Sequence, residues 1–173
     1  MNPPSPRVAI SGEDPAYFEL CFRPCVELVS TVRRFVSDFY ATVLKDADLG
    51  SRLALATHEL LENAVKYSTS PETTLRVEIM RSTGVATVTS WNETDQVHIA
   101  TITRLFADMA ETNSPIDYYE SLLRGERQAV SSSGLGLARV GAEALMGLGY
   151  EVSGSRVCIR AHTQVDASGL WIA

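Results

Sequence analysis

Cysteine, long apolar runs and a recognisable leader are all scarce or missing in this chain of 173 residues. The three cysteines, Cys21, Cys25 and Cys158, are an odd number in apolar surroundings. This favours buried free thiols over a disulfide framework or a metal site, and it indicates the cytoplasm. No apolar run approaches the roughly 20 residues that cross a membrane, and the start, Met-Asn-Pro-Pro-Ser-Pro-Arg, does not resemble a signal peptide. We therefore expect a cytoplasmic protein without membrane attachment.

Positive charge and several catalytic motifs are also lacking. Lys and Arg number 15 against 21 Asp and Glu, which gives a net charge of −6 and a pI near 5.1. Nucleic-acid binding needs a basic stripe, so we expect no nucleic-acid partner. A Gly-x-Ser-x-Gly elbow is absent, which leaves serine-nucleophile chemistry without support. A P-loop and the third glycine of a dinucleotide fingerprint are absent as well.

The remaining composition is that of an ordinary globular protein. Apolar residues make up 45% and charged residues 21% of a chain long enough to bury one core. The prolines near the start predict a short flexible lead-in over 1–15. We expect residues 16–173 to form a single domain.

Hydrophobic periodicity predicts an alternation of helices and strands. Helices are expected at 26–44, 49–67, 95–109, 118–123 and 135–146. Strands are expected at 17–23, 74–80, 85–91, 150–152 and 156–161, with 147–149 as a turn and 170–172 as an edge strand or a packed tail. Helices in the first half, a mixed sheet and one late helix that follows glycine predict a two-layer α/β sandwich.

The predicted helix over 49–67 carries a polar stripe. At about 100° per residue, Glu59, Asn63 and Lys66 lie together, beside the packed face. The apolar face carries Leu53, Leu60, Leu61 and Ala64. One interpretation is a solvated helix face. The other gives the Asn63 oxygen to a magnesium ion, and gives Glu59 the role of a base that activates a water or hydroxyl for attack on a terminal phosphate.

A second motif, Ser133-Gly134-Leu135-Gly136, opens the late helix. It could be only a helix start capped by serine. Alternatively, unpaired backbone N–H groups at this helix start bind phosphate, and the polar stretch over 111–133 forms a lid. Lys66 and Arg139 could then neutralise phosphate, whereas Arg124 and Arg127 are expected to remain solvated.

Taken in this order, the two motifs resemble those of the GHKL (Bergerat-fold) ATPase superfamily, and within it the bacterial anti-sigma-factor switch kinases. Glu59-Leu-Leu-Glu-Asn63-Ala-Val-Lys66-Tyr67 is similar to the asparagine box of that superfamily. Ser133-Gly134-Leu135-Gly136-Leu137 is similar to its second glycine box, and the likeness extends over 17–161. The resemblance implies a histidine-kinase-like ATPase domain with a mixed sheet, ATP and Mg between sheet and helices, and a lid between the boxes.

The first glycine box of that superfamily, Asp-x-Gly-x-Gly, is degenerate here and reads Asn92-Glu-Thr-Asp-Gln96. Asn92 could still accept a hydrogen bond from the adenine amino group. Thr94 and Gln96 replace both glycines and would crowd the base.

Two functions therefore compete. One is an ATP-binding regulator, with a homodimer among its expected assemblies. It would control a protein of a sigma-factor or similar pathway and could act as a serine/threonine kinase. The other is a module that works by protein contacts without nucleotide turnover.

Overall fold

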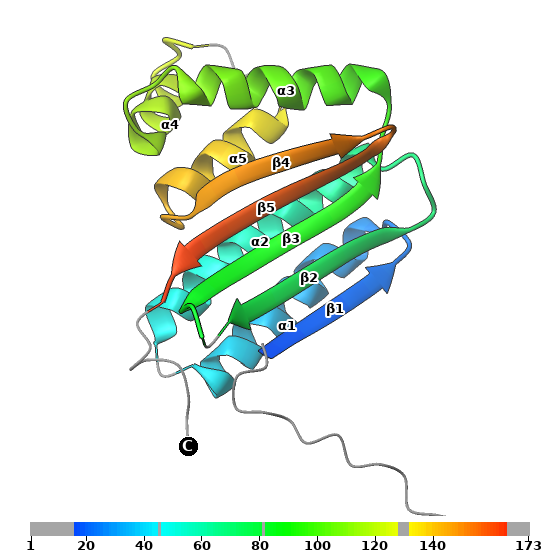
Figure 1. Ribbon diagram of the computed structural model, residues 1–173, viewed down its shortest axis with the longest axis vertical. Helices are drawn as coiled ribbons and strands as arrows, with labels where there is room; N and C mark the ends of the chain where they lie inside the picture. Colours follow the sequence, from blue (N-terminus) through cyan, green and yellow to red (C-terminus); the bar gives the residue numbers. More distant parts are fainter. Residues whose placement is uncertain (1–15, 45, 81, 128–131, 166–173) are drawn as a thin grey trace, which may run out of the picture.

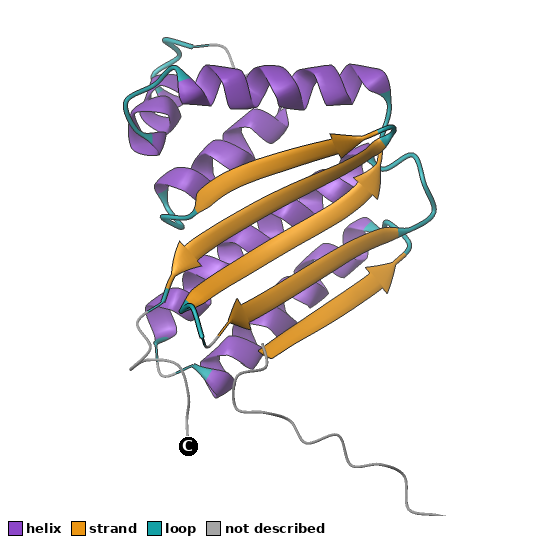
Figure 2. Ribbon diagram, viewed as in Figure 1, coloured by secondary structure: helices purple, strands orange, loops and turns teal. Residues whose placement is uncertain are grey.

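The computed structural model describes residues 16–44, 46–80, 82–127 and 132–165. A five-stranded sheet forms one layer, and α1, α2 and α5 lie behind it in the view of Figures 1 and 2. The elements in chain order are β1 (Ala16–Phe22), α1 (Val26–Val43), α2 (Ala47–Tyr67), β2 (Thr73–Met80), β3 (Val85–Glu93), α3 (Gln96–Ala110), α4 (Pro115–Leu123), α5 (Ser132–Ala142), β4 (Gly147–Ser153) and β5 (Arg156–Gln164). The predicted two-layer α/β sandwich is confirmed. The predicted lead-in over 1–15 and the tail over 170–172 lie outside the described residues.

The expected mixed sheet is wrong, because every pair of neighbouring strands is antiparallel. The order is β1-β2-β3-β5-β4, with all four pairings antiparallel. The reason lies in the connections: β2–β3 and β4–β5 are hairpins, which make antiparallel neighbours by construction. The long excursion through α3, α4 and α5 returns the chain at the far edge, so that β5 lies against β3 with Glu93 opposite Arg156.

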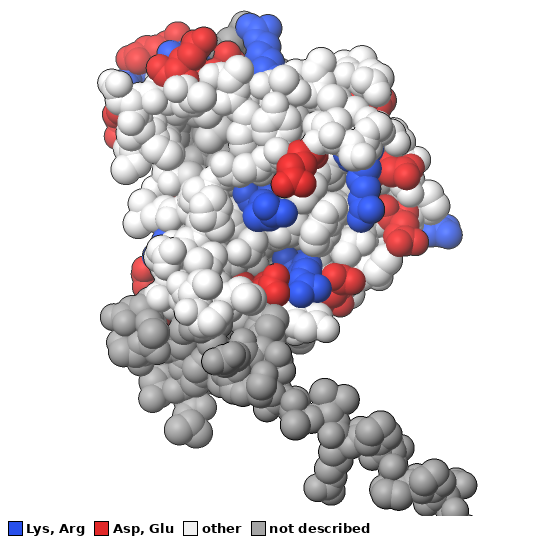
Figure 3. All heavy atoms as spheres, in the orientation of Figure 1, with Lys and Arg blue, Asp and Glu red and all other residues white. Residues whose placement is uncertain are grey.

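Strand alternation decides which side chains meet the helices. Along β2, the buried positions alternate with partly exposed ones, and Leu75, Val77 and Ile79 face the core under α1 and α2. The opposite face of the sheet, shown in Figure 3, carries scattered charges among uncharged side chains. Arg76 there lies 3.4 Å from Glu19 and 3.1 Å from Glu78, both on neighbouring positions of the open face.

Helix starts follow local capping. The Asp46 carboxylate accepts a hydrogen bond from the Leu49 N–H at 3.0 Å, and the Asp95 carboxylate accepts one from the His98 N–H at 2.8 Å. Ser114 caps α4, which has Pro115 in its first turn, so that this helix begins three residues before the predicted Tyr118. None of the helices in the described part of the chain is long and apolar enough to cross a membrane.

The predicted end of the last helix, at Met146, is wrong: α5 stops at Ala142 and β4 begins at Gly147, where a turn was expected. In this connection, the backbone carbonyls accept hydrogen bonds from the side chain of Arg52 of α2 instead of from further helical N–H groups. Its Nε donates to the Ala144 carbonyl at 2.6 Å, and its Nη2 donates to the Leu145 carbonyl at 2.9 Å and to Thr163 Oγ1 at 2.8 Å. Leu145 takes a φ of 51°, so the chain reverses here without a glycine.

Candidate functional site

Four of the residues selected from the sequence line one pocket. Glu59, Asn63 and Lys66 of α2 and Gly136 of α5 surround a cavity of about 310 Å³. Val26, Val29, Glu62 and Val65 complete its lining. Glu59 and Asn63 are only 7% exposed each, which is deeper than a polar stripe beside the packed face implies. Packing of α5 against α2 covers them and converts a helix surface into a partly enclosed site.

Both glycines lie inside α5, whereas only Gly136 was expected there, because the helix begins at Ser132, three residues earlier than predicted. Gly134 therefore lies within the first turn, where backbone N–H groups have no partner inside the helix. Gly136 lies against the Glu59 carboxylate so closely that a Cβ at this position would collide with Oε2. Leu135 is 40% exposed and lines a neighbouring cavity of about 330 Å³ together with Glu59, Glu62 and Gly136. The Ser133 side chain lies outside the described residues.

A chain of polar contacts crosses this second cavity and joins three helices. Arg139 Nη1 lies 3.3 Å from Glu59 Oε1, and Arg139 Nε donates to Glu143 Oε2 at 2.8 Å. The Tyr119 hydroxyl of α4 donates to Glu143 Oε1 at 2.9 Å. Sequence reasoning missed Tyr119 and Glu143. The four-residue spacing of Arg139 and Glu143 was a readable signal for one pair, whereas only the fold brings α4 to them.

The electrostatics of Glu59 suit a proton acceptor. Burial raises the pKa of Glu59 above its usual value, and the nearby His58 and Arg139 oppose this shift. The bond from Arg139 lowers the pKa of Glu143, which therefore stays ionised and holds the guanidinium. The two carboxylates that share Arg139 thus have different environments. Glu59 is covered and has a raised pKa, whereas Glu143 is exposed and has a lowered pKa.

Asn63 has an unexplained amide. Its Nδ2 is buried and has no hydrogen-bond partner in the described part of the chain. An orphaned buried donor is uncommon in folded proteins and requires an explanation. A phosphate oxygen in the pocket would accept from Nδ2, and Oδ1 would remain available to a hard cation such as Mg²⁺. The residues of this pocket therefore fit a metal–phosphate group.

Asn92 is not brought to the same pocket. It lies within β3 and lines a separate cavity of about 280 Å³, with Ser70, Glu72, Thr74, Trp91, Glu93 and Arg156. Its Nδ2 is 3.4 Å from the Glu93 carbonyl, the acceptor that the structure gives it. Asn63 and Asn92 thus line two different cavities, so the cavity around Asn63 does not include the residue expected to contact adenine.

Hydrogen bonds join the turn after β3 to the end of α2. This turn contains Thr94, which stands where the first glycine box has a glycine. Thr94, 2% exposed, donates its hydroxyl proton to the Tyr67 carbonyl at 2.7 Å, and the Thr69 N–H donates to the Glu93 carbonyl at 2.8 Å. Beside this junction the Tyr67 and His98 rings stack, with centroids 3.7 Å apart and planes within 10°. Gln96 is exposed at the first position of α3. Of the two residues expected to crowd the base, Thr94 is thus bonded to the Tyr67 carbonyl and Gln96 is exposed to solvent.

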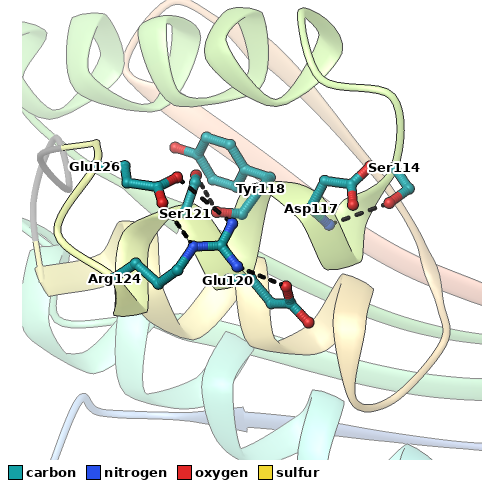
Figure 4. A network of polar contacts seen from close by, with 7 residues as sticks. All are labelled: Ser114, Asp117, Tyr118, Glu120, Ser121, Arg124 and Glu126. Atoms are coloured by element: carbon teal, nitrogen blue, oxygen red, sulfur yellow. Dashed lines mark hydrogen bonds and ion pairs between the residues drawn. The ribbon is translucent and has the colours of Figure 1, made fainter.

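The predicted lid region contains α4, and Figure 4 shows how its polar residues are used. Arg124, which follows the last residue of α4, donates to Glu120 at 2.9 Å and to Glu126 at 2.8 Å, and all three residues are exposed. Neither Arg124 nor Arg127 lines the pockets around Glu59. The expected solvated role of Arg124 agrees with this geometry. Residues 128–131 of the predicted lid lie outside the described part.

The contact between Gly136 and Glu59 predicts the effect of adding one methyl group. Gly136→Ala would push the Glu59 carboxylate away and crowd the helix interface, a change that costs about 1–3 kcal/mol, of which helix propensity returns up to about 1 kcal/mol. We expect a net loss of about 1 kcal/mol in the free energy of unfolding, measured by urea denaturation. Gly149→Ala is the control, because nothing lies within 4 Å of the added Cβ. A Gly136→Ala protein more stable than wild type would contradict the contact.

Comparison with known proteins supplies a fold neighbour but no family. No protein-family model and no curated protein matches this chain. Solved structures do match, among them a chain from the crystal structure of the SiaB–SiaC complex from Pseudomonas aeruginosa. The TM-score is 0.60 at 14% sequence identity, and the match covers 83% of this chain and 88% of that chain. At this identity the likeness is one of fold: this chain is an α/β sandwich similar to a protein that was crystallised in a two-protein complex.

Proposed function

We propose that this chain is a regulatory protein that binds the phosphate end of a nucleotide with Mg²⁺ and controls a protein partner, in the manner of the GHKL switch kinases that its motifs resemble. The observation that carries the proposal is the meeting of Glu59, Asn63, Lys66 and Gly136 in one pocket. Two distant segments supply these residues, and the buried Asn63 amide there lacks a partner. A merely solvated helix face explains neither fact.

The charges of the pocket support a requirement for Mg²⁺. Glu59 and Glu62 line it against the single ammonium of Lys66. A polyphosphate would meet net negative charge there, so a divalent cation is needed to offset the repulsion. Mg²⁺ commonly binds through one or two protein oxygens and several phosphate or water oxygens, which suits Asn63 Oδ1 as a protein ligand.

The proposed reaction is phosphotransfer to a serine or threonine hydroxyl of the partner, and Glu59 is the residue that would accept the hydroxyl proton. Its raised pKa brings it nearer to the range of an efficient general base. The structural neighbour was crystallised in a two-protein complex, which supports a protein partner by analogy of fold. Partners in a sigma-factor or similar signalling pathway follow from the resemblance of the two motif boxes.

The arrangement around Asn92 supports weak base selection. Because Asn92 lies outside the phosphate pocket and Thr94 is committed to the Tyr67 carbonyl, the base would gain few polar contacts. We expect ATP, GTP and inorganic tripolyphosphate to bind with affinities within about tenfold of one another, a difference of about 1.4 kcal/mol.

The test is a thermal-shift titration with ATP, GTP and tripolyphosphate, each with and without Mg²⁺. A ligand at about a hundred times its dissociation constant stabilises the fold by roughly 2.7 kcal/mol. The expected result is a shift with all three ligands that disappears when Mg²⁺ is omitted. An unchanged melting curve at millimolar ligand would reject the proposal and favour a nucleotide-independent interaction module. A shift with ATP alone would restore an adenine site.

A further inference from the structure

Arg139 lies where it can report on the phosphate pocket. Its guanidinium has two acidic partners, Glu59 on α2 and Glu143, which directly follows the end of α5. The arginine side chain is 42% exposed, whereas the side chain of Glu59, taken alone, is 9% exposed. Arg139 thus lies at the open side of the cavity that shares Glu59, Glu62 and Gly136 with the phosphate pocket. A group that enters beside Gly136 comes within reach of this cation.

The two ion pairs of Arg139 differ in geometry. The bond to Glu143 is 2.8 Å, within the usual range of charge-assisted bonds, whereas that to Glu59 is 3.3 Å and longer than this range. The Glu59 pair is therefore the weaker one, and a phosphate, which accepts two parallel bonds from a guanidinium, can replace it. Glu143 is in turn bonded to Tyr119, so a movement of the guanidinium reaches α4 through one side chain.

We propose that Arg139 is a switch residue, which holds the Glu59 carboxylate in the ligand-free protein, transfers to the terminal phosphate of the bound ligand, and thereby signals occupancy through Glu143 and Tyr119 to helix α4. This inference rests on the proposed phosphate-binding function and adds its regulation. Transfer of Arg139 has two consequences. Glu59 loses a neighbouring positive charge and becomes a stronger proton acceptor, because Arg139 opposes the upward pKa shift that burial causes. Glu143 follows the guanidinium, and the Tyr119 hydroxyl loses its acceptor.

The first test needs no ligand. Arg139→Gln should raise the pH at which Glu59 titrates, followed by the carboxyl carbon signal in NMR. Arg104→Gln is the matched control, because Arg104 also pairs with a carboxylate four residues away but lies 74% exposed on α3. An identical Glu59 titration in wild type and Arg139→Gln would overturn the holding role.

The second test follows amide hydrogen exchange over Pro115–Leu123 with Mg²⁺ and either ATP or tripolyphosphate. In wild type, exchange across α4 should rise roughly fivefold on binding, the equivalent of one lost hydrogen bond. Tyr119→Phe should bind the ligand normally, show this raised exchange already without ligand, and no longer respond. Arg139→Gln should bind about tenfold more weakly and leave α4 unresponsive, while Arg104→Gln behaves as wild type.

The outcomes separate the two proposals. Ligand binding with unchanged α4 exchange would overturn the switch and leave the phosphate-binding function intact. Absence of binding in wild type would overturn both. If Arg139→Gln does not fold, as judged by circular dichroism, Tyr119→Phe decides the question, because it leaves Arg139 and both carboxylates in place: a normal ligand response in this variant would overturn the pathway to α4.

Discussion

Asn63→Ala is expected to abolish stabilisation by Mg²⁺ and nucleotide completely. At about a hundred times the dissociation constant, wild type should gain roughly 2.7 kcal/mol, or about 5–11 °C in melting temperature for a chain of this size. The variant lacks both the amide donor for a phosphate oxygen and the oxygen for the cation. It should therefore melt at the same temperature with and without ligand in a calorimetric scan.

The ligand-free behaviour of Asn63→Ala distinguishes a binding residue from a structural one. The Asn63 Nδ2 is buried without a partner, so its removal relieves an unpaired polar group rather than breaking a bond. The melting temperature of the ligand-free variant should equal or exceed that of wild type. Asn113→Ala, at an exposed asparagine between α3 and α4, is the control and should keep the full ligand response. A normal ligand response in Asn63→Ala would remove Asn63 from the site.

Glu59→Gln should lower phosphotransfer or nucleotide turnover by about 10²–10⁴-fold, the usual contribution of a general base. Glutamine has the same size and keeps a hydrogen-bonding oxygen for Arg139, so binding measured by thermal shift should change little. Steady-state turnover with the physiological partner, or with water as acceptor, is the measurement. Equal rates in the variant and wild type would show that Glu59 takes no part in proton transfer.

The same variant should also change how stability depends on pH. Burial raises the pKa of Glu59 in the folded protein, so the folded state keeps this proton at pH values where the unfolded chain, with a pKa of about 4.3, has released it. The contribution of Glu59 to stability is thus greatest below about pH 4 and falls as the pH rises through the raised pKa. Glu59→Gln lacks this fall. Urea denaturation from pH 4 to 8 should show the variant gaining on wild type as pH rises.

Most of the fold could be predicted from local sequence signals. The prediction failed where contacts between distant residues determine the structure. Periodicity located α2 because its apolar side chains repeat over five turns, and Asp95 marked the start of α3. The end of α5 escaped prediction because its apolar pattern continues to Met146, whereas Arg52, 92 residues earlier than Ala144, supplies the competing bonds. Strand direction escaped for the same reason: the position of β5 beside β3 depends on where three intervening helices return the chain.

The candidate site divides along the same line. Glu59, Asn63 and Lys66 could be grouped from helical spacing alone, and the glycine motif could be added from its residue types. Asn92 could not be placed, because its distance from Asn63 depends on how the turn after β3 meets the end of α2. The link from Glu59 through Arg139 and Glu143 to Tyr119 joins residues up to 84 positions apart. Helical spacing accounts for the pair of Arg139 and Glu143 alone, and no spacing rule predicts the other two contacts.

Arg52 anchors one end of α5 to α2, which determines how this helix can move. Its bonds to the Ala144 and Leu145 carbonyls anchor the chain just past the carboxyl end of this helix to α2, about 10 Å before Glu59 along the same helix. At the amino end of α5, Gly136 packs against the Glu59 carboxylate, and Arg139, in the last turn, adds the longer bond to the same carboxylate. A displacement at Gly134 would then tilt α5 about its anchored end at Ala144 rather than shift the whole helix. Small displacements near the phosphate pocket would be converted into a tilt that α4, which packs against α5 through Pro115 and Gly141, must follow.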